Sequence, residues 1–201
     1  MLMLATLILM LFNSSQVGIN IWAFQAASSI ASPALNAIMV PFAESFFIVL
    51  PFLALYLVWK RDNDVYSFIL AAVVLFALGE VLKYIFQEAR PCSLSSLSWI
   101  NHPVCESGFA FPSNHAITLT GLIFFLKRYR ILQVLYIIWL VVILFGRIYL
   151  GQHYLTDVVA GAIISLIIGY VIYHYRNKVY ALAQRLRLDI LTPKQKQQIG
   201  S

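Results

Sequence analysis

Long apolar runs constrain the fold of this chain more than any other feature of its sequence. Four of them are continuous, at about 42–59, 65–86, 131–149 and 154–174. A helix needs about 20 mostly apolar residues to cross a membrane, whereas a transmembrane β-strand would alternate over about ten. Charged residues make up 11% of the chain, against about 25% in a soluble domain. The sequence therefore predicts an all-α, polytopic membrane helix bundle that forms a single domain over 1–201.

Shorter segments add to the predicted bundle. Residues 112–126 are apolar, and residues 1–12 are apolar but too short to span a membrane alone. Residues 16–32 mix aromatic with polar side chains, which favours a helix lying along the membrane surface. We expect about six transmembrane helices, with 1–33 forming a short first membrane segment and an interfacial helix.

The basic residues predict how the bundle is oriented. Of the 14 lysines and arginines, eleven would lie on one side of the membrane if each run crosses once. These are Lys60, Arg61, Lys127, Arg128, Arg130, Arg176, Lys178, Arg185, Arg187, Lys194 and Lys196. Basic residues favour the cytoplasmic side, so 176–201 is expected to be a basic cytoplasmic tail that meets anionic lipid rather than nucleic acid. The other three, Lys83, Arg90 and Arg147, would then face outward from the plasma membrane.

Lys83 and Arg90 are seven residues apart, or about two helical turns, which would place them on one face of a helix ended by Pro91. Two cations stacked there would repel unless an anion lay between them. Phosphate suits both the fork of an arginine and the point charge of a lysine. Charged residues inside a membrane are unfavourable and indicate a function. The alternative is that both side chains snorkel to the lipid boundary.

The sequence Pro112-Ser113-Asn114-His115 opens the next apolar run and is typical of a helix start. The free backbone N–H groups of a helix start, together with the Ser113 hydroxyl, are suited to binding the same anion. His115 titrates near neutral pH and is a candidate general acid. An ordinary helix cap followed by an isolated histidine is the alternative interpretation.

Arg147, His153 and Asp157 form the third polar group. If the segment is helical, His153 and Asp157 at i and i+4 are adjacent, and the carboxylate would fix the imidazole tautomer. This makes His153 a candidate nucleophile, although a buried structural hydrogen bond would give the same spacing. Three nearby cations disfavour a zinc site, so we expect no metal and no other cofactor.

Cys92 and Cys105 lie in the longest loop, about 87–111, on the side predicted to face outward. An oxidising compartment favours a disulfide between them. Such a bridge would help to fix the neighbouring Arg90, and two free thiols are the alternative.

Taken together, the three groups resemble the signature of the type-2 phosphatidic acid phosphatase superfamily, which is K-x6-R-P, then P-S-G-H, then S-R-x5-H-x3-D. The matching stretches are Lys83-x6-Arg90-Pro91, Pro112-Ser113-Asn114-His115 and Gly146-Arg147-x5-His153-x3-Asp157. The resemblance covers about 80–160 by motif. Asn114 replaces a glycine and Gly146 replaces a serine, while every catalytic residue type is present.

The resemblance implies a six-helix bundle with its active site between helices near the outer membrane surface. His153 would attack phosphorus to form a phosphohistidine, Asp157 would orient it, and His115 would protonate the leaving oxygen. The phosphoryl oxygens would be held by Lys83, Arg90, Ser113, Asn114 and Arg147.

The small size of the chain and the stretch Ser32–Met39 resemble the bacitracin-resistance type of undecaprenyl-pyrophosphate phosphatase, which removes the terminal phosphate from a polyprenyl diphosphate. The same motifs serve phosphatidylglycerophosphate and phosphatidic acid phosphatases. A lipid phosphotransferase would share the site, and a non-catalytic membrane protein would release no phosphate. Glu80, Glu88 and Glu106 are candidates for shaping the headgroup site, although Glu80 would equally pair with Lys83.

Overall fold

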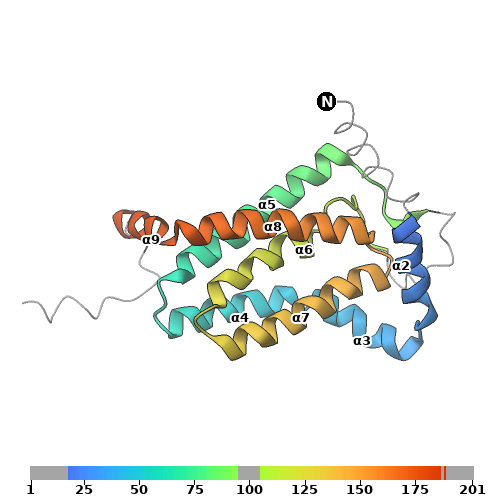
Figure 1. Ribbon diagram of the computed structural model, residues 1–201, viewed down its shortest axis with the longest axis horizontal. Coiled ribbons are helices and arrows are strands. Elements are labelled where there is room, and N and C mark those ends of the chain that lie inside the picture. The colour runs from blue at the N-terminus through green and yellow to red at the C-terminus, as the bar shows by residue number, and fades with distance from the viewer. Residues whose placement is uncertain (1–17, 95–104, 187, 189–201) are drawn as a thin grey trace, which may run out of the picture.

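The computed structural model describes residues 18–94, 105–186 and 188, and every regular element within them is helical (Figure 1). The short first membrane segment predicted for residues 1–12 lies outside this described part. The elements are α2 (Gly18–Ser29), α3 (Pro33–Glu44), α4 (Phe46–Trp59), α5 (Asp64–Phe86), η2 (Pro91–Ser93), α6 (Asn114–Leu119), η4 (Thr120–Leu126), α7 (Arg130–Tyr149), α8 (Leu155–His174) and α9 (Arg176–Arg185).

Three segments of the described chain are long and apolar enough to cross a membrane, and they are Asp64–Ser93, Arg130–Tyr149 and Leu155–His174. A fourth span is possible from α3 and α4, which meet at an angle of 45°. The apolar segment Asn114–Leu126 is shorter. The predicted membrane helix bundle is therefore confirmed as a fold class, while the expectation of six crossings stays a prediction.

The bend between α3 and α4 divides what the sequence presents as one run. Ser45 sits at the junction, where its hydroxyl donates to the carbonyl oxygen of Phe42 at 2.6 Å and accepts from Trp139 Nε1 at 3.0 Å. The serine thereby stabilises the break and ties it to α7. Phe46 and Phe47, the first residues of α4, line the pocket that is described below.

Glycines allow the central helices to approach closely. In α8, Gly169 packs on Gly121 of η4, and a Cβ added to Gly169 would lie 2.6 Å from the Gly121 Cα. Ser165 accepts a hydrogen bond from the Gly121 backbone N–H at 2.6 Å, which satisfies a polar group inside the bundle. Small residues at such crossings are how helices gain van der Waals contact where lipid removes the hydrophobic drive.

The core lies where α5, α6, η4 and α8 meet. Its most buried members include Leu57, Leu75, Ile117, Leu122 and Leu126. Large apolar side chains also cover the outside of the long helices, as Val73, Ile85, Ile131, Leu135 and Ile167 do. An apolar exterior of this kind is expected where the surrounding solvent is hydrocarbon.

The basic segments of the described chain gather at one end of the bundle, opposite the turn between α7 and α8 (Figure 1). Arg176 at the start of α9 pairs with Asp64 at the start of α5, with 3.4 Å between Nε and Oδ1. Tyr129 donates to Asp62 at 2.9 Å and joins the other two turns at that end. This arrangement agrees with the charge pattern in the sequence.

Candidate active site

Arg90 reaches the site from an extended segment rather than from a helix. α5 ends at Phe86, and Gln87 follows in the left-handed conformation with φ of 48°. Arg90 itself is extended, which the following Pro91 favours. The prediction that Lys83 and Arg90 share a helix face is therefore wrong, because the helix stops four residues before Arg90.

Backbone hydrogen bonds hold the three polar stretches together. The N–H of Cys92 donates to the carbonyl oxygen of Gly151 at 2.9 Å, which joins the Arg90 segment to the turn after α7. The N–H of Ser113 donates to the carbonyl oxygen of Asp157 at 3.3 Å, which joins α6 to α8. Main-chain hydrogen bonds thus bring stretches that are far apart in sequence next to each other.

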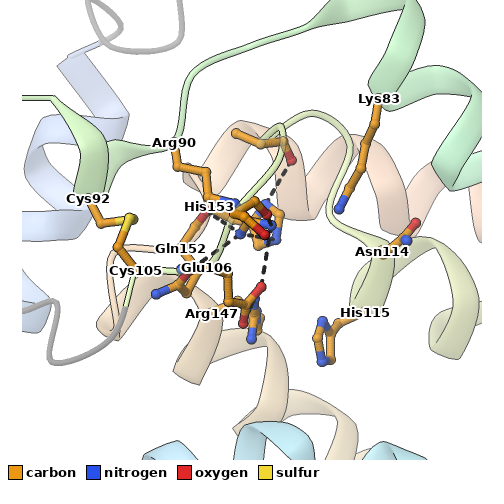
Figure 2. Close-up of polar contacts among 12 residues, drawn as sticks. Lys83, Arg90, Cys92, Cys105, Glu106, Asn114, His115, Arg147, Gln152 and His153 are labelled. Atoms are coloured by element: carbon orange, nitrogen blue, oxygen red, sulfur yellow. Dashed lines mark hydrogen bonds and ion pairs between the residues drawn. A yellow bond between two sulfur atoms is a disulfide. The ribbon is translucent and has the colours of Figure 1, made fainter.

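Cys92 and Cys105 form a disulfide in the structure, with 5.7 Å between their Cα atoms. The bridge links the segment that carries Arg90 to the segment that carries Glu106. Figure 2 shows the disulfide beside the polar cluster.

The turn after α7 positions His153. The carbonyl oxygen of Arg147 accepts from the backbone N–H groups of both Gln152 and His153, at 3.0 and 3.2 Å. Gly151 allows the turn, because its φ of 66° is one that side chains disfavour. Arg147 and His153 are therefore fixed relative to each other by a single carbonyl group.

His153 is buried and has a defined tautomer. Its Nδ1 lies 2.7 Å from the carbonyl oxygen of Ala110, so Nδ1 carries the hydrogen. Nε2 is then the nitrogen with the lone pair, and Nη1 of Arg90 lies 3.5 Å from it. Burial, with help from the charges of Arg147 and Arg90, lowers the pKa of His153 well below 6.5. The ring is therefore neutral at physiological pH, as a nitrogen nucleophile must be.

Asp157 is close to His153 but is not its nearest acceptor. Its Oδ2 lies 3.7 Å from His153 Nδ1 and accepts the backbone N–H of Tyr154 at 2.8 Å. Because α8 begins at Leu155, His153 precedes the helix that carries Asp157. The i, i+4 pair predicted on one helix is thus formed across a helix start, and Asp157 caps that start.

The carboxylate of Glu106 bridges the two buried arginines. Its Oε1 lies 2.6 Å from Nη2 of Arg147, and its Oε2 lies 3.3 Å from Nη2 of Arg90. Arg147 and Arg90 are 1% and 4% exposed, whereas Glu106 is 35% exposed.

A pocket of about 170 Å³ opens between these groups and α4, α5 and α6. Figure 2 shows Lys83, Asn114 and His115 facing Arg147, Glu106 and His153. The lining residues are Glu44, Phe46, Phe47, Phe76, Glu80, Lys83, Glu106, Asn114, His115, Arg147 and His153. Five of the predicted site residues therefore line one pocket.

The other three predicted residues are buried beside the pocket. Arg90 contacts it through Glu106 and His153, and Asp157 lies behind His153. Ser113 is fully buried, and its hydroxyl has no hydrogen-bond partner within the described part of the chain. An unpartnered buried hydroxyl is unfavourable, which suits a group that receives a ligand.

His115 is held from two sides. Its Nε2 lies 3.1 Å from the carbonyl oxygen of Ala43, and its ring meets Phe46 edge-on with 4.5 Å between centroids. With Nε2 bonded to the backbone, Nδ1 is the ring nitrogen left for the pocket.

The Asn114 side chain, which departs from the glycine of the motif, lies against α5. Its amide donates to Glu80 Oε1, and its Oδ1 occupies the space where a Cβ on Gly79 would be. Glu80 also lies 4.0 Å from the Nζ of Lys83. The predicted Glu80–Lys83 pairing is thus present as a long contact, and the nearer partner of Glu80 is Asn114.

Sequence reasoning did not identify two further members of the site. Gln152 is buried, and its side-chain oxygen accepts from Arg90 Nη1 at 3.4 Å and from the Glu106 N–H at 3.1 Å. Its position next to His153, inside an apolar region, was the available signal. The carbonyl of Ala110 carries no side-chain signal at all.

Within the described residues there is no group of three or more histidine, cysteine, aspartate or glutamate side chains placed to hold a metal ion. The polar groups that line the pocket are instead a mixture of the cations Lys83 and Arg147, two histidines, one asparagine and three glutamates.

Comparison with known proteins agrees with this geometry. The PAP2 superfamily profile matches residues 64–181, which is more than half of the chain and includes all three polar stretches. The chain belongs to the PAP2 superfamily. Members similar to it are lipid phosphatases, and the chain is a phosphatase of this membrane class.

Two relatives illustrate the similarity. The undecaprenyl-diphosphatase of Sulfolobus acidocaldarius is 28% identical over 166 residues, covering 80% of each chain. The lipid A 4'-phosphatase of Bacteroides thetaiotaomicron is 33% identical over 138 residues, covering 64% of this chain and 60% of the relative.

Two crystal structures share the fold. LpxE of Aquifex aeolicus has a TM-score of 0.70 and 26% identity, covering 80% of this chain and 98% of the other. The transmembrane PAP2-type phosphatidylglycerolphosphate phosphatase of Bacillus subtilis has a TM-score of 0.66 and 23% identity, covering 88% of this chain and 96% of the other.

Proposed function

We propose that this enzyme removes the terminal phosphate from a polyprenyl diphosphate, of which undecaprenyl diphosphate is the type, through a phosphohistidine on His153. The observation that carries the proposal is the hydrogen bond from His153 Nδ1 to Ala110, which leaves a neutral Nε2 beside the arginines and the pocket. The S. acidocaldarius relative supports the choice of substrate.

In the first step, the lone pair of His153 Nε2 forms a bond to phosphorus while the bond from phosphorus to the leaving oxygen breaks. Lys83, Arg90 and Arg147 hold the phosphoryl oxygens, on which negative charge is spread in the transition state. The Asp157 carboxylate, 3.7 Å from Nδ1, stabilises the cation that forms on the ring.

His115 supplies the proton to the leaving oxygen from Nδ1 as an imidazolium, whose Nε2–H donates to Ala43. Burial lowers the pKa of His115, so the negative charge of the bound phosphate stabilises this protonated form. In the second step His115 takes a proton from water, the water oxygen bonds to phosphorus, and the bond to His153 breaks. The products are inorganic phosphate and the lipid monophosphate. No step in this sequence uses a metal ion.

The mouth of the pocket supports a lipid substrate. Phe46 and Phe47 at the start of α4 and Phe76 on α5 form its apolar side, and the latter two are exposed on the outside of the bundle. A headgroup can therefore lie among the cations while its hydrocarbon tail passes between α4 and α5 into the bilayer. We place this mouth at the outward face of the plasma membrane, following the basic residues at the other end.

One observation favours a second candidate, phosphatidylglycerophosphate. Glu44 and Glu80, 53% and 43% exposed, line the same pocket as the phenylalanines. A carboxylate there can accept a hydrogen bond from the free hydroxyl of the headgroup glycerol and repels a second phosphate. Phosphatidic acid is a weaker alternative, because its leaving group has no hydroxyl for these carboxylates.

The deciding experiment measures phosphate release by the full chain, purified in detergent with EDTA, from the three lipids. Preference for undecaprenyl diphosphate supports the first proposal, and preference for phosphatidylglycerophosphate replaces it with the second. Loss of substrate with the phosphate appearing on an added lipid or sugar would identify a phosphotransferase. Strong inhibition by EDTA would contradict the metal-free mechanism.

A labelled substrate tests the intermediate. Rapid quenching should trap an acid-labile phosphoprotein in the wild-type chain and none in His153→Ala. Equal labelling of both proteins would overturn the assignment of His153 as the nucleophile.

A further inference from the structure

We propose that Glu106 is an internal anion that takes the place of phosphate between Arg90 and Arg147 and drives release of the inorganic phosphate product. The inference rests on the proposed function, because it assumes that these arginines bind the transferred phosphoryl group. It assigns to Glu106 a role in the catalytic cycle beyond shaping the headgroup site.

The position of the carboxylate is the first observation. Its two oxygens contact two guanidinium groups that come from separate stretches of the chain, at 2.6 and 3.3 Å. Both guanidinium groups are almost fully buried. Their unsatisfied charge would be costly without an anion between them, and Glu106 supplies that anion.

Carboxylate and phosphate compete for the same donors. A guanidinium group binds either of them through its planar fork of N–H groups. Because each Glu106 oxygen contacts an Nη2 atom, a phosphoryl group that uses those donors must displace the carboxylate. Substrate binding therefore separates Glu106 from at least one arginine.

The backbone around Glu106 keeps the carboxylate close after it is displaced. Its N–H donates to the Gln152 side chain at 3.1 Å, and Cys105 before it is bridged to Cys92. The next residue, Ser107, accepts from Arg90 Nη2 through its carbonyl oxygen at 3.4 Å. Side-chain rotation alone thus moves the carboxylate in and out, at a high effective concentration.

The consequence concerns the last step of the cycle. Inorganic phosphate is left among Lys83, Arg90 and Arg147, where it is a strong competitor for the next substrate. The returning Glu106 carboxylate replaces the contacts that phosphate loses, so the product leaves without exposing bare buried charges. Without Glu106, product release would become slow.

The test is the affinity of the full chain in detergent for inorganic phosphate, measured by calorimetry without turnover. Glu106→Gln keeps the shape of the side chain and removes its charge, and we expect it to bind phosphate at least about tenfold more tightly. Steady-state inhibition by added phosphate should strengthen by the same factor. Equal or weaker phosphate affinity in Glu106→Gln would overturn the proposal.

Glu44→Gln is the matched control. Glu44 lines the same pocket, but its Oε1 is 3.9 Å from Arg147 Nη1, and within the described residues it forms no ion pair with Arg90. We expect a change in phosphate affinity below about threefold, because this variant removes one solvent-screened negative charge from the pocket and leaves the contacts of Glu106 with both arginines in place. A tenfold gain in this variant as well would mean that any negative charge acts alike, and would overturn the specific role of Glu106.

A second variant covers failure of Glu106→Gln to fold. Glu106→Asp keeps the charge but is too short to contact both arginines, so phosphate affinity should rise by a smaller factor. Unchanged affinity would again count against the proposal. Because these measurements need no lipid turnover, a chain that hydrolyses none of the three lipids would refute the proposed function separately.

Discussion

The Nδ1 atom of His153 lies 2.7 Å from the carbonyl oxygen of Ala110, closer than to any oxygen of Asp157. The tautomer of the proposed nucleophile is therefore set by the main chain. This assigns to Asp157 two other tasks, which are stabilising positive charge on the ring and capping α8 through Tyr154.

Asp157→Asn separates the charge of Asp157 from its position. Asparagine can still accept from the Tyr154 N–H, and Ala110 still fixes the tautomer, so the variant keeps the cap and removes the negative charge beside the ring. We expect kcat to fall on the order of a hundredfold with KM little changed, which corresponds to about 2.7 kcal/mol of barrier. The kcat of His153→Ala should fall to the background rate. Equal losses in the two variants would mean that Asp157, rather than Ala110, sets the tautomer.

The pH dependence of kcat/KM should reflect the low pKa of His153. Burial disfavours the imidazolium, so the neutral nucleophile persists as pH falls through 6.5, where an ordinary histidine would be half protonated. We expect the acidic limb that belongs to His153 to lie below pH 6.5. A wild-type profile whose activity is lost through a single acidic limb at or above pH 6.5 would contradict this.

The same shift affects stability. The unfolded chain protonates this histidine near pH 6.5 and the folded chain only at lower pH, so unfolding takes up a proton in between. The contribution of His153 is thus complete above pH 6.5 and is lost as pH falls. Thermal melts of wild-type and His153→Gln protein from pH 8 to 5 should show the wild type losing more stability.

Gly79 and Asn114 should be thermodynamically coupled. A Cβ at Gly79 would collide with the Asn114 side chain and lie 2.8 Å from Ile117 Cγ2. Gly79→Ala should destabilise by about 1–3 kcal/mol, as overpacking does. Adding Asn114→Gly should restore part of that loss by removing one of the two collisions. Additive effects in a double-mutant cycle of melting temperatures would contradict the packing.

The disulfide should stabilise the loop that carries Glu106. Bridging residues 13 apart removes about 3 kcal/mol of unfolded-chain entropy in the loop-closure account. The variant with both Cys92→Ser and Cys105→Ser should therefore melt roughly 6–12 °C lower. Reducing agent should lower the melting temperature of the wild type but not that of the variant. Thiol labelling of unreduced wild-type protein should find no free cysteine.

Much of the fold follows from local sequence signals. The long apolar runs correspond to α5, α7 and α8. A continuous apolar stretch of that length must form a helix in lipid, because only a helix pairs all of its own backbone polar groups. The bend at Ser45 was not predicted, because it depends on Trp139 of α7, far away in sequence. The early end of α5 was missed for a similar reason, as Gln87 gives no glycine-like signal for its left-handed conformation.

The motifs predicted which residues meet, but not how they contact one another. Lys83, His115, Arg147 and His153 line one pocket, as three stretches of polar residues between apolar runs suggest. The contact of His153 with Ala110 is invisible in sequence, because every residue has a carbonyl group. The bridging position of Glu106 depends on a loop fold that residue types do not specify.

The apolar mouth formed by Phe47 and Phe76 makes the proposed reaction two-dimensional. A lipid that enters between α4 and α5 keeps its tail in hydrocarbon throughout, so the substrate concentration that the site meets is its mole fraction in the surrounding film. Diluting the substrate with inert detergent at constant bulk concentration would then slow the enzyme, while adding water would leave its rate per molecule unchanged.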